Sequence, residues 1–104
     1  YCAQVGRMVA QKKARLGVFI CYTGVGSSIA LNKVPGVRAS LVHNVKGARF
    51  TRLHNDSNVL VLGSAFVNAD LAKRMLSTYL KTEFEGGRHV RRLEQIKKIE
   101  KGLL

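Results

Sequence analysis

The sequence has few cysteines, little acidic charge and no long hydrophobic run. Cys2 and Cys21 lie in dissimilar surroundings, without a Cys-x-x-Cys pair or histidine-rich spacing, which argues against a disulfide scaffold and a zinc site. No apolar run approaches the roughly 20 residues that a membrane span needs, and no signal-peptide pattern opens the chain. These absences predict a soluble cytoplasmic protein with no metal ion and no membrane partner.

Acidic residues are the scarcest charged class. Six Asp and Glu stand against eighteen Lys and Arg, so the formal net charge is +12 and the sequence pI is about 10.4. This excess predicts an anionic partner, and RNA, a phosphorylated substrate and an acidic protein surface all fit it. The basic residues are spread along the chain and form no single stripe, so charge alone does not choose among the three.

The 104 residues are enough for one domain, residues 1–104. So short a chain buries a modest share of its surface, and a buried interface with a partner would help to stabilise it. The first residue is Tyr1 rather than Met. The sequence therefore leaves open whether further residues precede it.

Hydrophobic periodicity predicts strands that alternate with helices. Helical spacing occurs over residues 3–14, 27–31, 45–53 and 70–80, and again in a basic helix over 88–102 that follows Gly86-Gly87; strands are predicted over 17–21, 37–42 and 58–62. The continuous apolar run 17–21 is typical of a strand covered on both faces. The alternation predicts an α/β fold, a doubly wound, Rossmann-like parallel sheet with helices on both faces.

In open parallel sheets, ligands bind beyond the carboxyl ends of the strands. This rule brings together three turns, which follow Cys21, Val42 and Leu62. The first turn, Thr23-Gly24-Val25-Gly26, offers backbone N–H groups that can approach an anion, or it is a tight turn without a ligand. Cys21 is either a base or nucleophile beside that turn or a small buried hydrophobic residue.

Two further segments carry candidate site residues. His54 and Asn55 follow a predicted helix, where they could cap it or take part in acid/base chemistry, since histidine exchanges protons near neutral pH. Arg88 and Arg92 lie four residues apart near the start of the last helix, and two guanidinium groups on one face suit a phosphate group. A solvated basic helix is the alternative reading of that segment.

Three blocks of the sequence, taken in order, resemble the type B ribose-5-phosphate isomerase family, to which the galactose-6-phosphate isomerase subunits are related. The blocks are ICYTGVGSSIALNKVPGVRA, RLHNDSNVLVLGS and TEFEGGRHVRR, and the likeness covers nearly the whole chain. It implies a phosphorylated sugar as substrate, an enediolate intermediate, and no metal or organic cofactor. It also implies a homodimer or a dimer of dimers whose active site is shared between subunits, with helix 88–102 packed on the partner.

The resemblance also implies roles for individual residues. Cys21 matches the family's base, and His54 matches the histidine that opens the sugar ring. Thr23 and the backbone amides of Gly24, Val25 and Gly26 match the groups that stabilise the enediolate. The predicted substrate-binding residues are Tyr22, Gly24, Val25, Gly26, Asn55, Arg88 and Arg92.

The chain departs from the family pattern at several positions. Tyr22 replaces the usual glycine, Ala65 stands where a ligand-binding arginine is common, and Asn44 replaces a common aspartate. The family's opening strand, with its Asp-His pair, has no counterpart here. These departures and the charge of +12 keep a second hypothesis open, a catalytically impaired relative that serves as a basic binding or assembly subunit on RNA.

Overall fold

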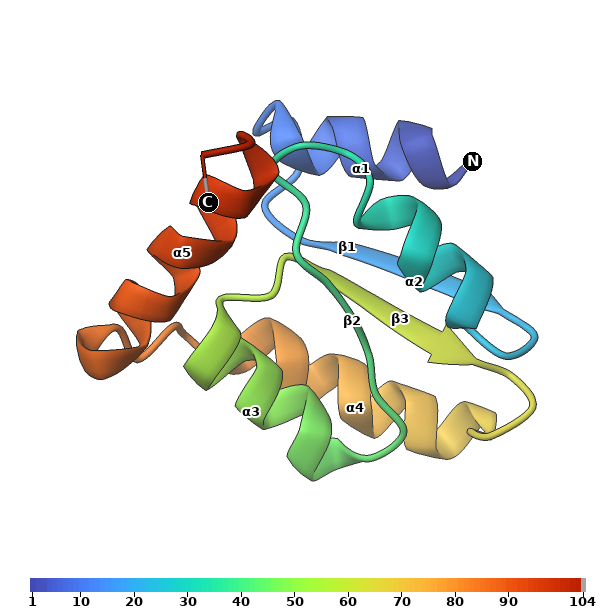
Figure 1. Cartoon of the computed structure of the whole chain (residues 1–104). Coiled ribbons are helices and arrows are strands. Elements are labelled where there is room, and N and C mark those ends of the chain that lie inside the picture. Colours follow the sequence, from blue (N-terminus) through green and yellow to red (C-terminus); the bar gives the residue numbers. More distant parts are fainter. Residues whose placement is uncertain (104) are drawn as a thin grey trace.

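The computed structural model describes residues 1–103 and shows one open sheet of three parallel strands in the order β1-β3-β2 (Figure 1). The strands are β1 (Gly17–Cys21), β2 (Ala39–Leu41) and β3 (Val59–Gly63). The helices are α1 (Cys2–Ala10), α2 (Val25–Leu31), α3 (Val45–Asn55), α4 (Ala69–Lys81) and α5 (Val90–Glu100), and the 3₁₀ turn η1 (Gly87–His89) precedes α5. Helices α1 and α2 cover one face of the sheet, and α3 and α4 cover the other. The predicted doubly wound α/β fold is confirmed.

The central strand β3 joins two hydrophobic cores. Its side chains alternate between the faces, so Leu60 and Leu62 pack with Met75 under α3 and α4, while Val59 and Val61 pack under α1 and α2. All five residues of β3 are buried. Burying one such side chain contributes about 1.5–3 kcal/mol, so this strand anchors both layers.

Strand β1 pairs with β3 alone among the described residues, and helices cover both of its faces. Val18 packs against the core under α3 and α4, and Phe19 packs against the core under α1 and α2. The cover is incomplete, because Ile20 is 59% exposed. The apolar run at 17–21 resembles that of β3, but within residues 1–103 only β3 has a hydrogen-bonded strand on each side. Composition alone does not distinguish an edge strand from a central one.

Some element boundaries differ from the predicted ones. Helix α1 ends at Ala10 rather than near residue 14, because Lys12 adopts a left-handed conformation with φ of 63°. Strand β2 has three residues rather than the predicted 37–42. At the start of β2 the Asn32 side chain accepts a hydrogen bond from Ala39 N–H and donates one to the Ala39 carbonyl. These two bonds occupy the outer edge of the strand at this residue. The last helix is split into η1 and α5 rather than continuous from residue 88.

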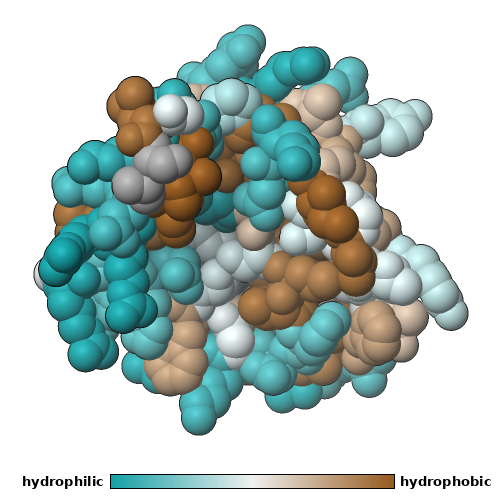
Figure 2. Space-filling model, in the orientation of Figure 1, coloured by the Kyte–Doolittle hydropathy of each residue, from teal (hydrophilic) through white to brown (hydrophobic). Residues whose placement is uncertain are grey.

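Hydrophobic atoms are exposed at several places on this face of the molecule. They lie over α2, beside β2 and near the carboxyl end of α5, whereas hydrophilic side chains predominate over the rest of α5 (Figure 2). Val25 and Ile29 of α2 are each about half exposed. Within residues 1–103, no helix combines the length and the apolar character needed to cross a membrane.

Candidate active site

The three turns predicted to meet at the carboxyl end of the sheet do lie together. Ser64 N–H donates to the Cys21 carbonyl at 2.8 Å, and Ala65 N–H donates to the Tyr22 carbonyl at 2.9 Å, so the turns after β1 and β3 are joined. The turn after β2 is connected through His43, whose ring centroid lies 5.0 Å from that of Phe66. This end of the sheet therefore holds the first group of candidate site residues.

The thiol of Cys21 is the centre of that group. Its Sγ atom accepts a hydrogen bond from Gly24 N–H at 3.1 Å and another from the Ser27 hydroxyl at 3.0 Å. Val25 N–H donates to Thr23 Oγ1 at 3.3 Å, which leaves the Thr23 hydroxyl hydrogen free for another acceptor. Cys21 is only partly buried, and these two contacts fix the position of its sulfur.

Glycine is required on both sides of this turn. Gly24 caps α2 with a φ of 83°, and a Cβ there would lie 2.5 Å from Leu41 Cδ1. A Cβ on Gly63 would lie 2.4 Å from the Thr23 carbonyl oxygen, so the turn packs directly on the end of β3. Tyr22, in contrast, does not have a left-handed backbone conformation. Among residues 1–103, the only residues other than glycine with a positive φ are Lys12 and Asp56. The bulky side chain at position 22 therefore strains no backbone angle, and it is 75% exposed.

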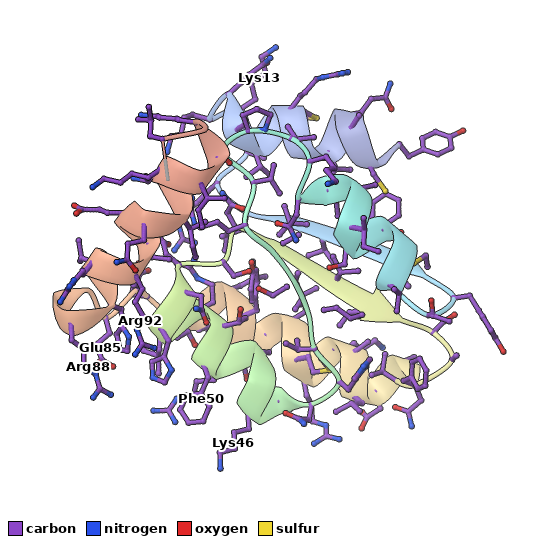
Figure 3. The ribbon with its side chains drawn as sticks, in the orientation of Figure 1. Lys13, Lys46, Phe50, Glu85, Arg88 and Arg92 are labelled. Carbon is purple, nitrogen blue, oxygen red and sulfur yellow. The ribbon has the colours of Figure 1, made fainter. Side chains whose placement is uncertain are left out.

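The second group of predicted residues lies together in one cavity of about 500 Å³. His54, Asn55, Arg88 and Arg92 line it, and His89 completes the lining. Helix α3 supplies the first two residues at its carboxyl end, and η1 and α5 supply the others. Figure 3 shows Arg88, Arg92 and Glu85 gathered at this end of the molecule. Two guanidinium groups and two imidazoles around one hollow favour an anion such as a phosphate group.

His89 was not predicted as a site residue. Its ring stacks on that of His54 with centroids 4.5 Å apart, and the opposite face of His54 has Phe50 at 5.0 Å. His54 is therefore held between two flat rings. The Gly-Gly-Arg-His sequence was the only available signal, because a contact between residues 35 positions apart is not visible in the local pattern.

A buried polar network fixes the end of α3 that carries His54 and Asn55. The guanidinium group of Arg52, only 4% exposed, donates to the carboxylate of Asp56 and the carbonyls of Ser57 and Thr82. Asp56 also pairs with Arg38 at 3.4 Å and ends the helix in a left-handed conformation with φ of 46°. The network thus links the helix end to the start of β2 and to the segment after α4.

The two groups of site residues lie toward opposite ends of the sheet. Cys21 is the last residue of β1, at the carboxyl end of the sheet, whereas α3 returns to the amino end of the sheet before it reaches His54 (Figure 1). The structure therefore brings together Cys21, Tyr22, Thr23 and the glycines in one place. It brings together His54, Asn55, Arg88 and Arg92 in another. A single copy does not unite the two groups.

The sheet topology, with a free thiol and a glycine turn at the carboxyl ends of the strands and a basic cavity elsewhere, defines a ligand-binding protein of the doubly wound α/β class. Residues 1–96 match the model of a family described as Ribose/Galactose Isomerase. Ribose-5-phosphate isomerase B of Escherichia coli K12 is 45% identical over 100 residues, which are 96% of this chain and 67% of that protein.

Solved structures agree with the sequence relatives. The structure of ribose-5-phosphate isomerase B from Clostridium thermocellum superposes with a TM-score of 0.96 at 45% identity, covering 100% of this chain and 70% of that one. The enzyme from Mycoplasma genitalium with bound ribulose 5-phosphate has a TM-score of 0.91 at 42% identity, covering 96% of this chain and 66% of that one. The chain belongs to the ribose/galactose isomerase family of sugar-phosphate isomerases.

Proposed function

We propose that the protein interconverts ribose 5-phosphate and ribulose 5-phosphate through an enediolate, with Cys21 as the base. The observation that carries the proposal is the pair of hydrogen bonds that Gly24 and Ser27 donate to Cys21 Sγ. They hold the sulfur of this partly buried residue at the carboxyl end of the sheet, where parallel sheets bind their ligands, and the thiolate is the form that removes protons. Relatives named for this activity, one of them with bound ribulose 5-phosphate, support the choice of substrate.

The proposed chemistry uses the turn as a set of donors. Cys21 takes the proton from the carbon next to the carbonyl, and the electron pair moves onto the carbonyl oxygen to form the enediolate. The Thr23 hydroxyl and the backbone amides from Gly24 to Gly26 stabilise that oxyanion, a contribution of about 3–4 kcal/mol for a well-placed donor. The proton of the adjacent hydroxyl group moves to this oxygen, the carbonyl re-forms on the carbon that lost its proton, and the Cys21 thiol returns that proton to the former carbonyl carbon. The side chains of Tyr22 and Val25, both exposed beside this turn, form the rim of the sugar site.

The second group of residues binds the other part of the same substrate in this proposal. His54 opens the sugar ring by proton transfer, Asn55 binds a sugar hydroxyl, and Arg88 and Arg92 bind the phosphate group. Within one subunit this group lies at the other end of the sheet from Cys21. In the proposal, the complete site therefore combines the Cys21 turn of one subunit with the arginine cavity of another. The protein would then be a homodimer or a dimer of dimers, with α5 against the partner.

Mixing two inactive variants tests the shared site. In the full-length protein, Cys21→Ala and Arg92→Ala should each remove the isomerase activity. If random exchange gives a mixed dimer with one intact site, mixing them should restore about a quarter of the wild-type activity. Cys2→Ala, a change at a cysteine far along the chain from the site, is the matched control and should stay active. Full activity of Cys21→Ala would exclude Cys21 as the base, and no recovery on mixing would exclude the shared site.

The non-catalytic alternative makes a different set of predictions. A basic subunit on RNA should bind RNA with an affinity that falls steeply with salt. It should also lack turnover with both sugar phosphates. We favour the isomerase because the second group of residues forms a cavity of molecular size rather than an open basic stripe. Tight RNA binding together with absent turnover would reverse this choice.

A further inference from the structure

Three side chains with metal-binding atoms converge beside the arginine cavity. His54, Glu85 and His89 each offer one ligand atom, and these atoms all lie within 4.8 Å of one another. They come from the end of α3, from the segment before η1, and from η1 itself. Figure 3 shows Glu85 close to Arg88 at this end of the molecule. The sequence spacing gave no indication of such a cluster.

His89 supplies a second observation that points to a ligand. Its Nε2 atom is buried and has no hydrogen-bond partner among the described residues. Glu85 Oε1 lies 3.6 Å from it, and the side chain of His89 is only 12% exposed. Buried polar atoms of side chains normally have a partner, so an unpaired ring nitrogen facing a carboxylate marks a place for a cation or a proton.

The donor set fits a transition metal better than a hard cation. Two imidazoles and one carboxylate are a frequent ligand set for Zn²⁺, with bonds of about 2.0–2.2 Å and a fourth position for water. Ligand atoms around a tetrahedral ion at that bond length lie about 3.4 Å apart. The separation between His89 and Glu85 already matches this distance, and a rotation of the His54 ring away from its stacked position would complete the set.

We propose that His54, Glu85 and His89 bind a divalent transition-metal ion of the Zn²⁺ type, and that the bound ion blocks the adjoining cavity. The guanidinium groups of Arg88 and Arg92 line the same cavity, so the carboxylate of Glu85 must offset their repulsion of the ion. A metal ion bound to His54 would prevent this side chain from opening the sugar ring, the role that it has in the proposed function. Metal binding itself requires no catalytic activity.

Binding is measured without any turnover assay. The probes are Zn²⁺, in competition with a chromogenic chelator, and Co²⁺, through its visible absorption. The protein carries Cys2→Ser and Cys21→Ser so that no thiolate binds the ion. We expect about one equivalent to bind, and both Glu85→Gln and His89→Gln should weaken binding at least about tenfold. His43→Gln changes the one histidine outside the cluster and should leave the affinity unchanged.

Folding and inhibition separate the remaining outcomes. Circular dichroism shows whether each variant is folded, and a rise of Tm with Zn²⁺ that the His89→Gln variant lacks would confirm binding to the native state. In the active full-length protein, Zn²⁺ should inhibit competitively with the sugar phosphate, and a chelator should restore the rate. Zn²⁺ affinity that is equal in the folded His89→Gln variant and the parent would overturn the proposal, whether or not the protein is an isomerase.

Discussion

The hydroxyl group of Tyr79 lies 2.9 Å from Ser57 Oγ in the core between the sheet and α4. Both residues have no exposed surface, and Arg52 lies over the Tyr79 ring at 5.8 Å. Burial raises the pKa of Tyr79 from 10.0 to about 12, and the hydrogen bond with Ser57 and the charge of Arg52 oppose part of that rise. The hydrogen bond between Tyr79 and Ser57 thus attaches the segment that follows His54 and Asn55 to the hydrophobic core.

Stability should fall at high pH because of Tyr79. The unfolded chain releases this proton near pH 10 and the folded chain only near pH 12, so the unfolded state binds fewer protons between these values. The contribution is complete below pH 10 and is lost as the pH rises to about 12, a change of about 2–3 kcal/mol. Denaturant unfolding across this range should show the loss. The Tyr79→Phe variant should show a smaller one, and Tyr22→Phe, at an exposed tyrosine, should behave like the wild type.

Loss of the Arg52 side chain should destabilise the protein strongly. Arg52→Leu removes the donor to the carbonyls of Ser57 and Thr82 and leaves Arg38 as the remaining ion-pair partner of the Asp56 carboxylate. We expect the free energy of unfolding to fall by about 3 kcal/mol, as measured by urea denaturation. Arg49→Leu, on the exposed face of the same helix, should change it by less than about 0.5 kcal/mol. Equal effects of the two changes would show that the network does not stabilise the fold.

Local sequence was enough to predict the alternating elements and the Cys21 turn, because an apolar strand, a glycine turn and a helix start follow one another within fifteen residues. It did not show that β1 is an edge strand, which depends on the pairing of β1 with β3 alone. The stacking of His54 on His89 also depends on where η1 returns after α4. Such contacts arise from tertiary packing, which no short window of sequence contains.

Asn44 is the opposite case, a residue whose role is local. Its departure from the family pattern suggested a change at the site, but its side chain accepts the Gly47 N–H at 2.7 Å and caps α3. Asn and Asp both serve well at this position. Helix capping is therefore a sufficient explanation for asparagine at this position, and its place just before a predicted helix start indicates that role.

A methyl group at position 63 should displace the Cys21 turn. The Cβ of Gly63→Ala would lie 2.4 Å from the Thr23 carbonyl oxygen, and this neighbour is backbone rather than a flexible side chain. Overpacking of this kind costs about 1–3 kcal/mol, and the fall should appear in thermal or urea unfolding. Gly26→Ala is the matched control for stability, because a Cβ there meets no atom within 4 Å. A stable Gly63→Ala protein with an unstable Gly26→Ala protein would contradict the packing described for the turn.

The hydroxyl of Ser27 should matter for catalysis rather than for folding. It donates to Cys21 Sγ at 3.0 Å, and the neighbouring Ser28 uses its backbone carbonyl to accept from Asn32. If Cys21 is the base, Ser27→Ala removes one of the two donors that orient the sulfur, and a hydrogen bond to a charged group is worth about 1.5–3 kcal/mol. We expect kcat for ribose 5-phosphate to fall at least about tenfold with little change in KM. Ser28→Ala should keep wild-type kinetics, and both variants should retain the wild-type Tm. A loss that appears equally in Ser28→Ala, or only in KM, would mean that Ser27 does not act through Cys21.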